Sequence, residues 1–84
     1  MSLDDRSESI DRTKLAYVWE QMADGIRADI AAGVFTAGHR LPSETELARQ
    51  YGVARMTARK AIAELVKDGS VVVVHGRGTY VTES

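Results

Sequence analysis

The chain has 84 residues, a formal net charge of −1, 44% apolar and 27% charged residues, and no cysteine. A chain of this length hides only about 60 to 65% of its unfolded surface on folding, so we expect one small domain without a large enclosed active site. The composition is typical of a globular protein and not of a disordered one. The lack of cysteine excludes disulfides, a thiolate nucleophile and a thiolate zinc site. The sequence offers no combination of nucleophile, base and orienting group, and His39 and His75 are too far apart to indicate a metal site, so we expect no enzyme activity, no cofactor and no metal site.

The two parts of the chain differ in charge. Residues 1–32 carry four basic and seven acidic side chains, a net −3, whereas residues 33–84 carry seven basic and five acidic ones, a net +2. This asymmetry predicts an anionic partner for the second part. No apolar run approaches the roughly 18 residues that a membrane-spanning helix needs, and the N-terminus lacks an apolar signal region. We expect a cytoplasmic protein without a membrane partner.

The first 14 residues, MSLDDRSESIDRTK, are poor in apolar side chains and show no periodicity, so we expect 1–14 to be a flexible arm. The folded domain is predicted over 15–82, with a tail at 83–84. Apolar side chains recur at helical spacing at Trp19, Met22, Ala23, Ile26 and Ile30, and Gly33 is a typical helix end. Gly25 lies inside this helix, which predicts a close packing contact there.

A turn around Ala37 and Gly38 and a short extended segment precede Pro42. Ser43 and Glu46 then form S-x-x-E, the pattern of a capping box that starts a helix. The apolar residues of this second helix are Leu47, Ala48 and Tyr51, and Gly52 permits a sharp turn at its end. The pattern predicts a short helix followed by a tight turn.

A third helix is predicted from about Arg55 to Asp68, with Gly69 as its stop. Its apolar face consists of Ala58, Ala61, Ile62 and Leu65. Ala54 stands where a Ser or Thr cap is preferred, so the helix begins weakly. Two β-rich runs follow, joined by a turn of His75, Gly76, Arg77 and Gly78. This order predicts an α+β fold, mainly α: a winged helix-turn-helix with three helices, a short strand and a two-stranded wing.

The middle segment carries Arg49, Arg55, Arg59 and Lys60 within twelve positions and no acid among them. The first half of the third helix, RMTARK, has a shape that fits the DNA major groove. Arg55 and Arg59 lie one turn apart on the same stripe, and the planar fork of Arg matches O6 and N7 of guanine. We therefore predict DNA base contacts for Arg55 and Arg59.

Other groups are predicted to contact the DNA backbone or the minor groove. Phosphate or backbone contacts are predicted for Ser43, Thr45, Arg49, Thr57 and Lys60. Wing contacts are predicted for His75, Gly76, Arg77 and Gly78. The alternatives that stay open are a solvated basic face, a nonspecific nucleoid-type DNA binder, and a protein-interaction module that uses the strand Val71 to Val74.

The stretch LPSETELARQYGVARMTARKAIAELVKDG, followed by HGRGTYV, resembles the N-terminal DNA-binding domain of the GntR (gluconate-repressor) family of bacterial transcription regulators. VWEQMADGIRADIAAGVFTAGHRLPSE extends the match upstream, so that the resemblance covers roughly residues 17–82. Arg55-Met56-Thr57 is most similar to the HutC-like branch. The resemblance implies a winged helix-turn-helix that binds double-stranded DNA as a transcription regulator, with repression as the expected effect.

The resemblance also implies roles for particular residues. Those that match Arg55 and Arg59 contact bases or phosphates, those that match Ser43 and Thr57 contact the backbone, and those that match His75 and Gly76 approach the minor groove. It further implies a two-fold operator and a homodimer, weak or induced by DNA. Family members usually continue into an effector domain, and we expect no effector pocket in this chain. The sequence departs from the family pattern at Ala54, Thr45, Val73 and Val74.

Overall fold

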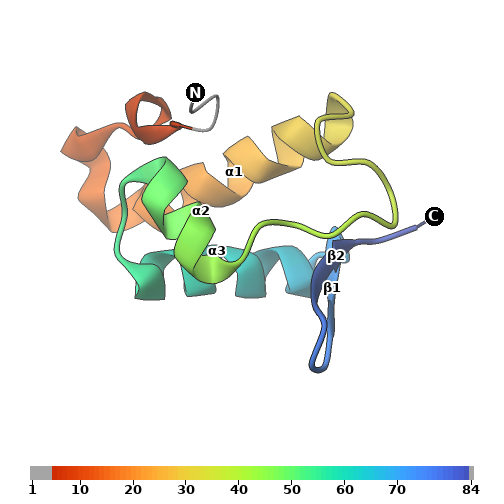
Figure 1. Cartoon of the computed structure of the whole chain (residues 1–84). Coiled ribbons are helices and arrows are strands. Elements are labelled where there is room, and N and C mark those ends of the chain that lie inside the picture. Colours follow the sequence, from red (N-terminus) through yellow and green to blue (C-terminus); the bar gives the residue numbers. More distant parts are fainter. Residues whose placement is uncertain (1–4, 84) are drawn as a thin grey trace.

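The computed structural model describes residues 5–83. Its elements are two 3-10 segments at Ser7–Ser9 and Arg12–Tyr17, the helices α1 (Val18–Ala31), α2 (Glu44–Tyr51) and α3 (Arg55–Lys67), and the strands β1 (Val71–Val74) and β2 (Gly78–Val81). Figure 1 shows α1 lying across α2 and α3, with the β1–β2 hairpin projecting from the end of α3. The predicted winged helix-turn-helix is confirmed. No helix in the described part of the chain has the length and apolarity to cross a membrane.

The core is built from one face of each helix and from the base of the wing. The buried residues are Ile10, Val18, Met22, Ala23, Ile26, Leu41, Leu47, Ala48, Tyr51, Ala58, Ala61, Ile62, Leu65, Val71 and Val81. The apolar faces predicted for the second and third helices are buried in full, because helical spacing places these side chains on one stripe of each helix. Trp19, which belongs to the apolar pattern of the first predicted helix, is only half-buried.

The predicted close contact at Gly25 is present. A Cβ atom at this position would lie 2.8 Å from the hydroxyl oxygen of Tyr51, so that any larger residue would displace the Tyr51 ring. Burial raises the pKa of the Tyr51 hydroxyl, and the nearby Asp29 carboxylate adds to this effect. The last residue of α2 is thus packed directly on the backbone of α1.

The wing is joined to the rest of the domain by a third segment of chain. β1 and β2 are antiparallel, with Val71 opposite Val81 and Val74 opposite Gly78. Residues 38–41 run along the other side of β2, where the short strand was predicted. Backbone hydrogen bonds link Gly38 N to Val81 O (2.9 Å), Val81 N to His39 O (2.9 Å) and Leu41 N to Thr79 O (2.8 Å), around an isolated bridge between Arg40 and Tyr80. The loop before α2 therefore fixes the position of the wing.

The sequence predicted a flexible arm over residues 1–14, and the structure describes residues 5–14 of this segment. Residues 5–14 lie against the domain, and Ile10 is 5% exposed within the core. Nη2 of Arg12 donates to the carbonyl oxygens of Tyr51 (3.1 Å) and Gly52 (3.0 Å), at the end of α2. Carbonyls at a helix C-terminus lack intrahelical partners, which explains why a guanidinium binds there. Residues 1–4 of the expected arm lie outside the described residues.

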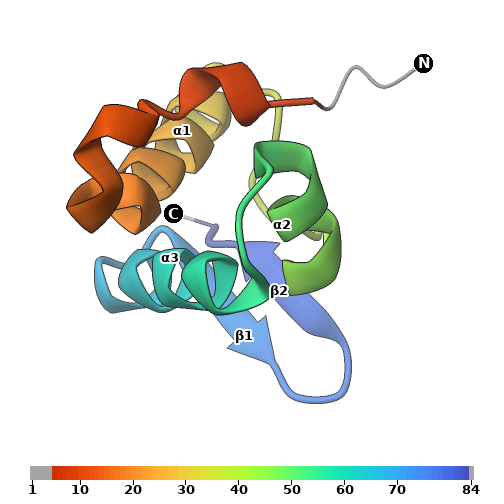
Figure 2. The ribbon, with the colours of Figure 1, turned by 90° about the vertical axis from the view of Figure 1, so that its left-hand side faces the viewer.

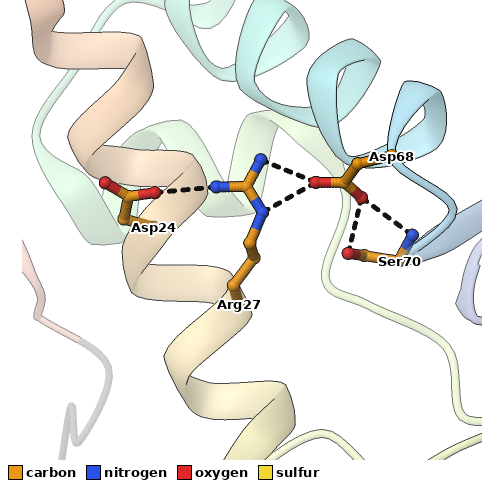
Figure 3. A network of polar contacts seen from close by, with 4 residues as sticks. All are labelled: Asp24, Arg27, Asp68 and Ser70. Atoms are coloured by element: carbon orange, nitrogen blue, oxygen red, sulfur yellow. Dashed lines mark hydrogen bonds and ion pairs between the residues drawn. The ribbon is translucent and has the colours of Figure 1, made fainter.

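Arg27 connects α1 to the end of α3 (Figure 3). Its Nε and Nη2 contact Oδ2 of Asp68 at 2.7 and 2.6 Å, and its Nη1 contacts Oδ1 of Asp24 at 2.7 Å. Oδ1 of Asp68 accepts from the hydroxyl (2.6 Å) and the backbone N–H (2.9 Å) of Ser70. The Ser70 hydroxyl, followed by its backbone N–H and the Arg27 guanidinium, lowers the pKa of Asp68. This network joins α1, α3 and the start of the wing.

Ile10→Ala is expected to destabilise the domain by about 2 to 5 kcal/mol, because the substitution removes a fully packed side chain and leaves a cavity. Urea unfolding followed by circular dichroism measures the change. Glu8→Ala, at an exposed position of the same segment, is the matched control and should have little effect. Equal unfolding free energies for the two variants would show that the segment does not contribute to the core.

Asp68→Asn should make the stability of the domain less sensitive to acid. The folded-state pKa of Asp68 lies below its ordinary value of 3.8, so the unfolded chain takes up a proton first as the pH falls. The stabilisation is therefore present above about pH 4 and is lost on further acidification. Urea unfolding at about pH 6 and pH 3 should show a smaller loss for Asp68→Asn than for the wild type. Equal losses in both proteins would contradict this role.

Candidate nucleic-acid interface

The start of α2 is held by the predicted capping box. The hydroxyl of Ser43 accepts from the backbone N–H of Glu46 at 3.1 Å, and the Glu46 carboxylate accepts from the backbone N–H of Ser43 at 2.9 Å. The backbone bond from Ser43 is the main reason that the pKa of Glu46 is lowered. The box fixes the direction in which α2 leaves the preceding loop.

The turn between α2 and α3 is tight. Gly52 adopts the left-handed conformation at φ 66°, and Val53 N donates to Ala48 O at 3.0 Å. Ala54 is the N-cap of α3, and no side chain caps this helix. The side-chain cap that the sequence lacks at Ala54 is thus absent at the start of α3. The first backbone N–H groups of α3 have no partner within the helix.

The outward face of α3 is centred on Met56, which is 66% exposed. The side chains of Arg55 and Arg59 are 67% and 60% exposed and lie on the α2 side, where both contact Glu44. Lys60 lies on the α1 side, with Nζ 4.8 Å from the centroid of the Trp19 ring. The structure thus brings Arg55 and Arg59 together, as the helical spacing predicts, and places Lys60 on the other margin of the face.

The remaining predicted backbone-contacting residues come from both helices of the motif. Ser43 and Thr45 lie at and just after the N-terminus of α2, and Arg49 follows Thr45 by one turn on the exposed side of this helix. Thr57 is half-buried in the first turn of α3. Ser43, Thr45 and Arg49 are thus exposed on α2 and its cap, whereas Thr57 is partly covered.

The wing ends in a three-residue turn of His75, Gly76 and Arg77, all exposed, in which Arg77 N donates to Val74 O at 2.9 Å. The sequence predicted a four-residue turn, but Gly78 is paired in β2. The hairpin extends past α2 and α3 on one side of the molecule, and the N-terminal segment lies on the opposite side (Figure 2).

Arg40 is a basic residue near the wing that the sequence reasoning missed. A Cβ atom at position 78 would lie 2.7 Å from Nε of Arg40, and Gly78 has φ 129°, a conformation that residues with a side chain rarely adopt. Arg40 lines a shallow depression together with His75 and Arg77. No motif around Arg40 indicates this, because its position follows from the pairing of residues 38–41 with β2.

Comparison with known proteins identifies the family. The family model described as "Bacterial regulatory proteins, gntR family" matches residues 19–81. The chain belongs to the gntR family. It is 53% identical over 53 residues to the "Probable fructoselysine utilization operon transcriptional repressor" of Escherichia coli (strain K12), covering 63% of this chain and 22% of that protein. It is 38% identical over 85 residues to the histidine utilization repressor of Pseudomonas aeruginosa, covering 92% of this chain and 34% of that protein.

A solved structure agrees with this assignment. AraR(DBD) in complex with operator ORX1 superposes with a TM-score of 0.73 at 39% identity, covering 76% of this chain and 77% of that one. The gntR-family resemblance and its HutC-like relatives are thus confirmed, and the family and fold are those of transcription regulators, not of enzymes. The chain spans about a fifth to a third of the length of the curated relatives named here. Within residues 5–83, no group of three or more metal-ligating side chains gathers at one place.

Proposed function

We propose that this chain binds double-stranded DNA in a sequence-specific manner and acts as a DNA-binding domain in transcription regulation. The observation that carries the proposal is the pair of exposed arginines, Arg55 and Arg59, on one stripe at the start of α3. In the proposed complex α3 enters the major groove and both guanidinium groups contact guanine edges. The likeness to AraR(DBD), which was solved with operator DNA, supports binding to an operator duplex.

Phosphate contacts position the domain on the duplex. They are assigned to Ser43, Thr45, Arg49 and Lys60, which are exposed, and to Thr57, which is half-buried in the first turn of α3. The hydroxyl of Ser43 accepts within the capping box and keeps its own proton for a phosphate oxygen. The contact with Trp19 holds the Lys60 ammonium at the α1 side of α3. In the proposed complex Lys60 contacts a DNA phosphate on this side of the groove, across from Arg55 and Arg59. The wing residues His75, Gly76, Arg77 and Gly78 are proposed to approach the minor groove.

Repression of a promoter is the regulatory effect that we propose, because the curated relatives named above are repressors. A two-fold operator fits a dimer in which each copy contacts one half-site. The dimer is proposed to be weak or induced by DNA, and we assign no effector site to residues 5–83. A bacterial regulator that binds chromosomal DNA acts in the cytoplasm.

A protein-interaction module is the second candidate. The side chains of Val72, Val73 and Val74 are exposed on β1, which has a free edge in the described sheet. Exposed apolar edge strands are a common site of strand pairing between chains. A nonspecific DNA binder is the third reading, and it would show a steep salt dependence without preference for a sequence.

Selection of bound duplexes from a random DNA pool, with recovered sites tested at two salt concentrations, is expected to converge on a two-fold motif. Base contacts by Arg55 and Arg59 are the reason for a preferred sequence, and phosphate contacts are the reason that binding weakens as the salt concentration rises. Binding without a motif would instead support the nonspecific binder. If no DNA is retained even at low salt, the hypothesis of a protein-interaction module is favoured.

Arg59→Ala is expected to weaken binding to the selected site by about 1 to 3 kcal/mol and to relax its specificity, because a bidentate base contact is lost. Lys60→Ala should weaken binding to all sequences similarly and lower the salt slope by about one unit. Titrations of both variants with the selected and a scrambled duplex separate the two effects. The division of roles is wrong if both variants lose the same factor on both duplexes.

A further inference from the structure

Glu44 lies between the two arginines that are proposed to contact bases. Its Oε1 is 3.5 Å from Nε of Arg55, and its Oε2 is 3.4 Å from Nε of Arg59. The Glu44 side chain is 27% exposed, so it lies between α2 and α3, whereas both arginine side chains are mostly exposed. One carboxylate of α2 thus contacts two cations of α3.

This arrangement counters the repulsion within the arginine pair. Two like charges at positions i and i+4 of a helix destabilise each other, and two long side chains side by side have many rotamers to choose from. A carboxylate between them offsets the repulsion and restricts both guanidinium groups to one side of α3. Both ion pairs are made through Nε, and the structure shows no hydrogen bond from the terminal Nη atoms of either arginine to another described residue. The Nη atoms carry donors that a guanine edge requires.

The contact is too weak to keep the arginines from DNA. Exposed ion pairs shift an equilibrium by about fivefold at most, and both distances here are long for a charge-assisted hydrogen bond. A good bidentate contact between Arg and guanine discriminates by roughly 5- to 150-fold. The stronger contact with the base therefore prevails over any competition from Glu44.

Glu44 also lowers the attraction of this surface to DNA in general. It is the first residue of α2, next to Ser43, where a phosphate would bind. Its negative charge opposes a phosphate at that place and reduces the net charge of the arginine pair. Nonspecific binding is driven by phosphate contacts, so it suffers most from this charge, whereas a base contact gains from arginines that are already oriented.

We propose that Glu44 is a positioning residue for sequence recognition: it orients Arg55 and Arg59 side by side before DNA binds and makes the pair selective for bases over phosphates. The inference rests on the proposed function, since it assigns a role within the same DNA-binding surface.

The test compares Glu44→Gln with Glu46→Gln. Both substitutions remove one negative charge from the first turn of α2, and Gln at position 46 retains the capping box. Neither ion pair with Arg55 or Arg59 involves Glu46. The affinity of each variant is measured for the selected duplex and for a scrambled one over a range of salt concentrations.

Glu44→Gln is expected to lower the ratio of specific to nonspecific affinity by about fivefold, because nonspecific binding tightens while the contact to the selected site gains nothing. Glu46→Gln should tighten binding to both duplexes by the same factor and leave the ratio unchanged. An unchanged ratio in Glu44→Gln would overturn the inference, because it would show that Glu44 affects binding to all sequences equally through its charge. A ratio that rises would also overturn it, and would make Glu44 a competitor of DNA.

The Nε–H signals of Arg55 and Arg59 in the NMR spectrum of the DNA-free domain provide a second measurement. They should shift in Glu44→Gln and stay in place in Glu46→Gln, because the carboxylate contacts both Nε atoms. Signals that do not move in either variant would overturn the orienting role. If the wild type selects no motif, the proposed function itself fails, whereas a wild-type motif with an unchanged ratio in Glu44→Gln refutes the role of Glu44 alone.

Discussion

The way α2 ends determines where α3 begins, and the exposed surface of the domain depends on this constraint. Tyr51 packs on the backbone of α1 at Gly25, where even a methyl group would approach its hydroxyl to 2.8 Å. Gly52 then turns the chain in the left-handed conformation, and Arg12 binds the carbonyls on both sides of this step. The helix-turn-helix is thus fixed by α1 on one side and by the N-terminal segment on the other. A rigid turn between two short helices gives side chains of α3 a defined position, which sequence recognition requires.

Charge is distributed so that the acidic chain keeps one basic surface. Arg6 pairs with Asp29, and Arg27 pairs with Asp24 and Asp68, all on the α1 side or at the far end of α3. The arginines at the start of α3 share the single carboxylate of Glu44 and remain largely exposed. The net charge of −1 therefore does not indicate the charge of the surface at the start of α3, because the ion pairs of Arg6 and Arg27 lie elsewhere on the domain.

Local patterns predicted most of the fold and part of the site. The capping box of Ser43 and Glu46 and the common stripe of Arg55 and Arg59 each depend on residues within one helix or turn, so spacing alone indicates them. A glycine inside a helix indicated a close contact at Gly25, but its partner Tyr51 belongs to another helix and follows only from the fold. The packing of Ile10 was not predictable, because one apolar residue in a polar segment makes no periodic pattern. The approach of Arg40 to Gly78 and of Glu44 to both arginines joins residues far apart in sequence. Such contacts follow from the tertiary fold and have no local signature.

The DNA-binding surface is tested most directly by a titration of the isotope-labelled domain with its selected duplex, followed by backbone amide NMR signals. We expect the largest changes at the start of α3 and at the turn of the wing, residues 75–77, and small changes along the N-terminal segment. Changes concentrated on the β1 edge at Val72, Val73 and Val74, with the start of α3 unaffected, would contradict this expectation. They would show that the duplex binds at the edge of the wing and that α3 does not enter the major groove.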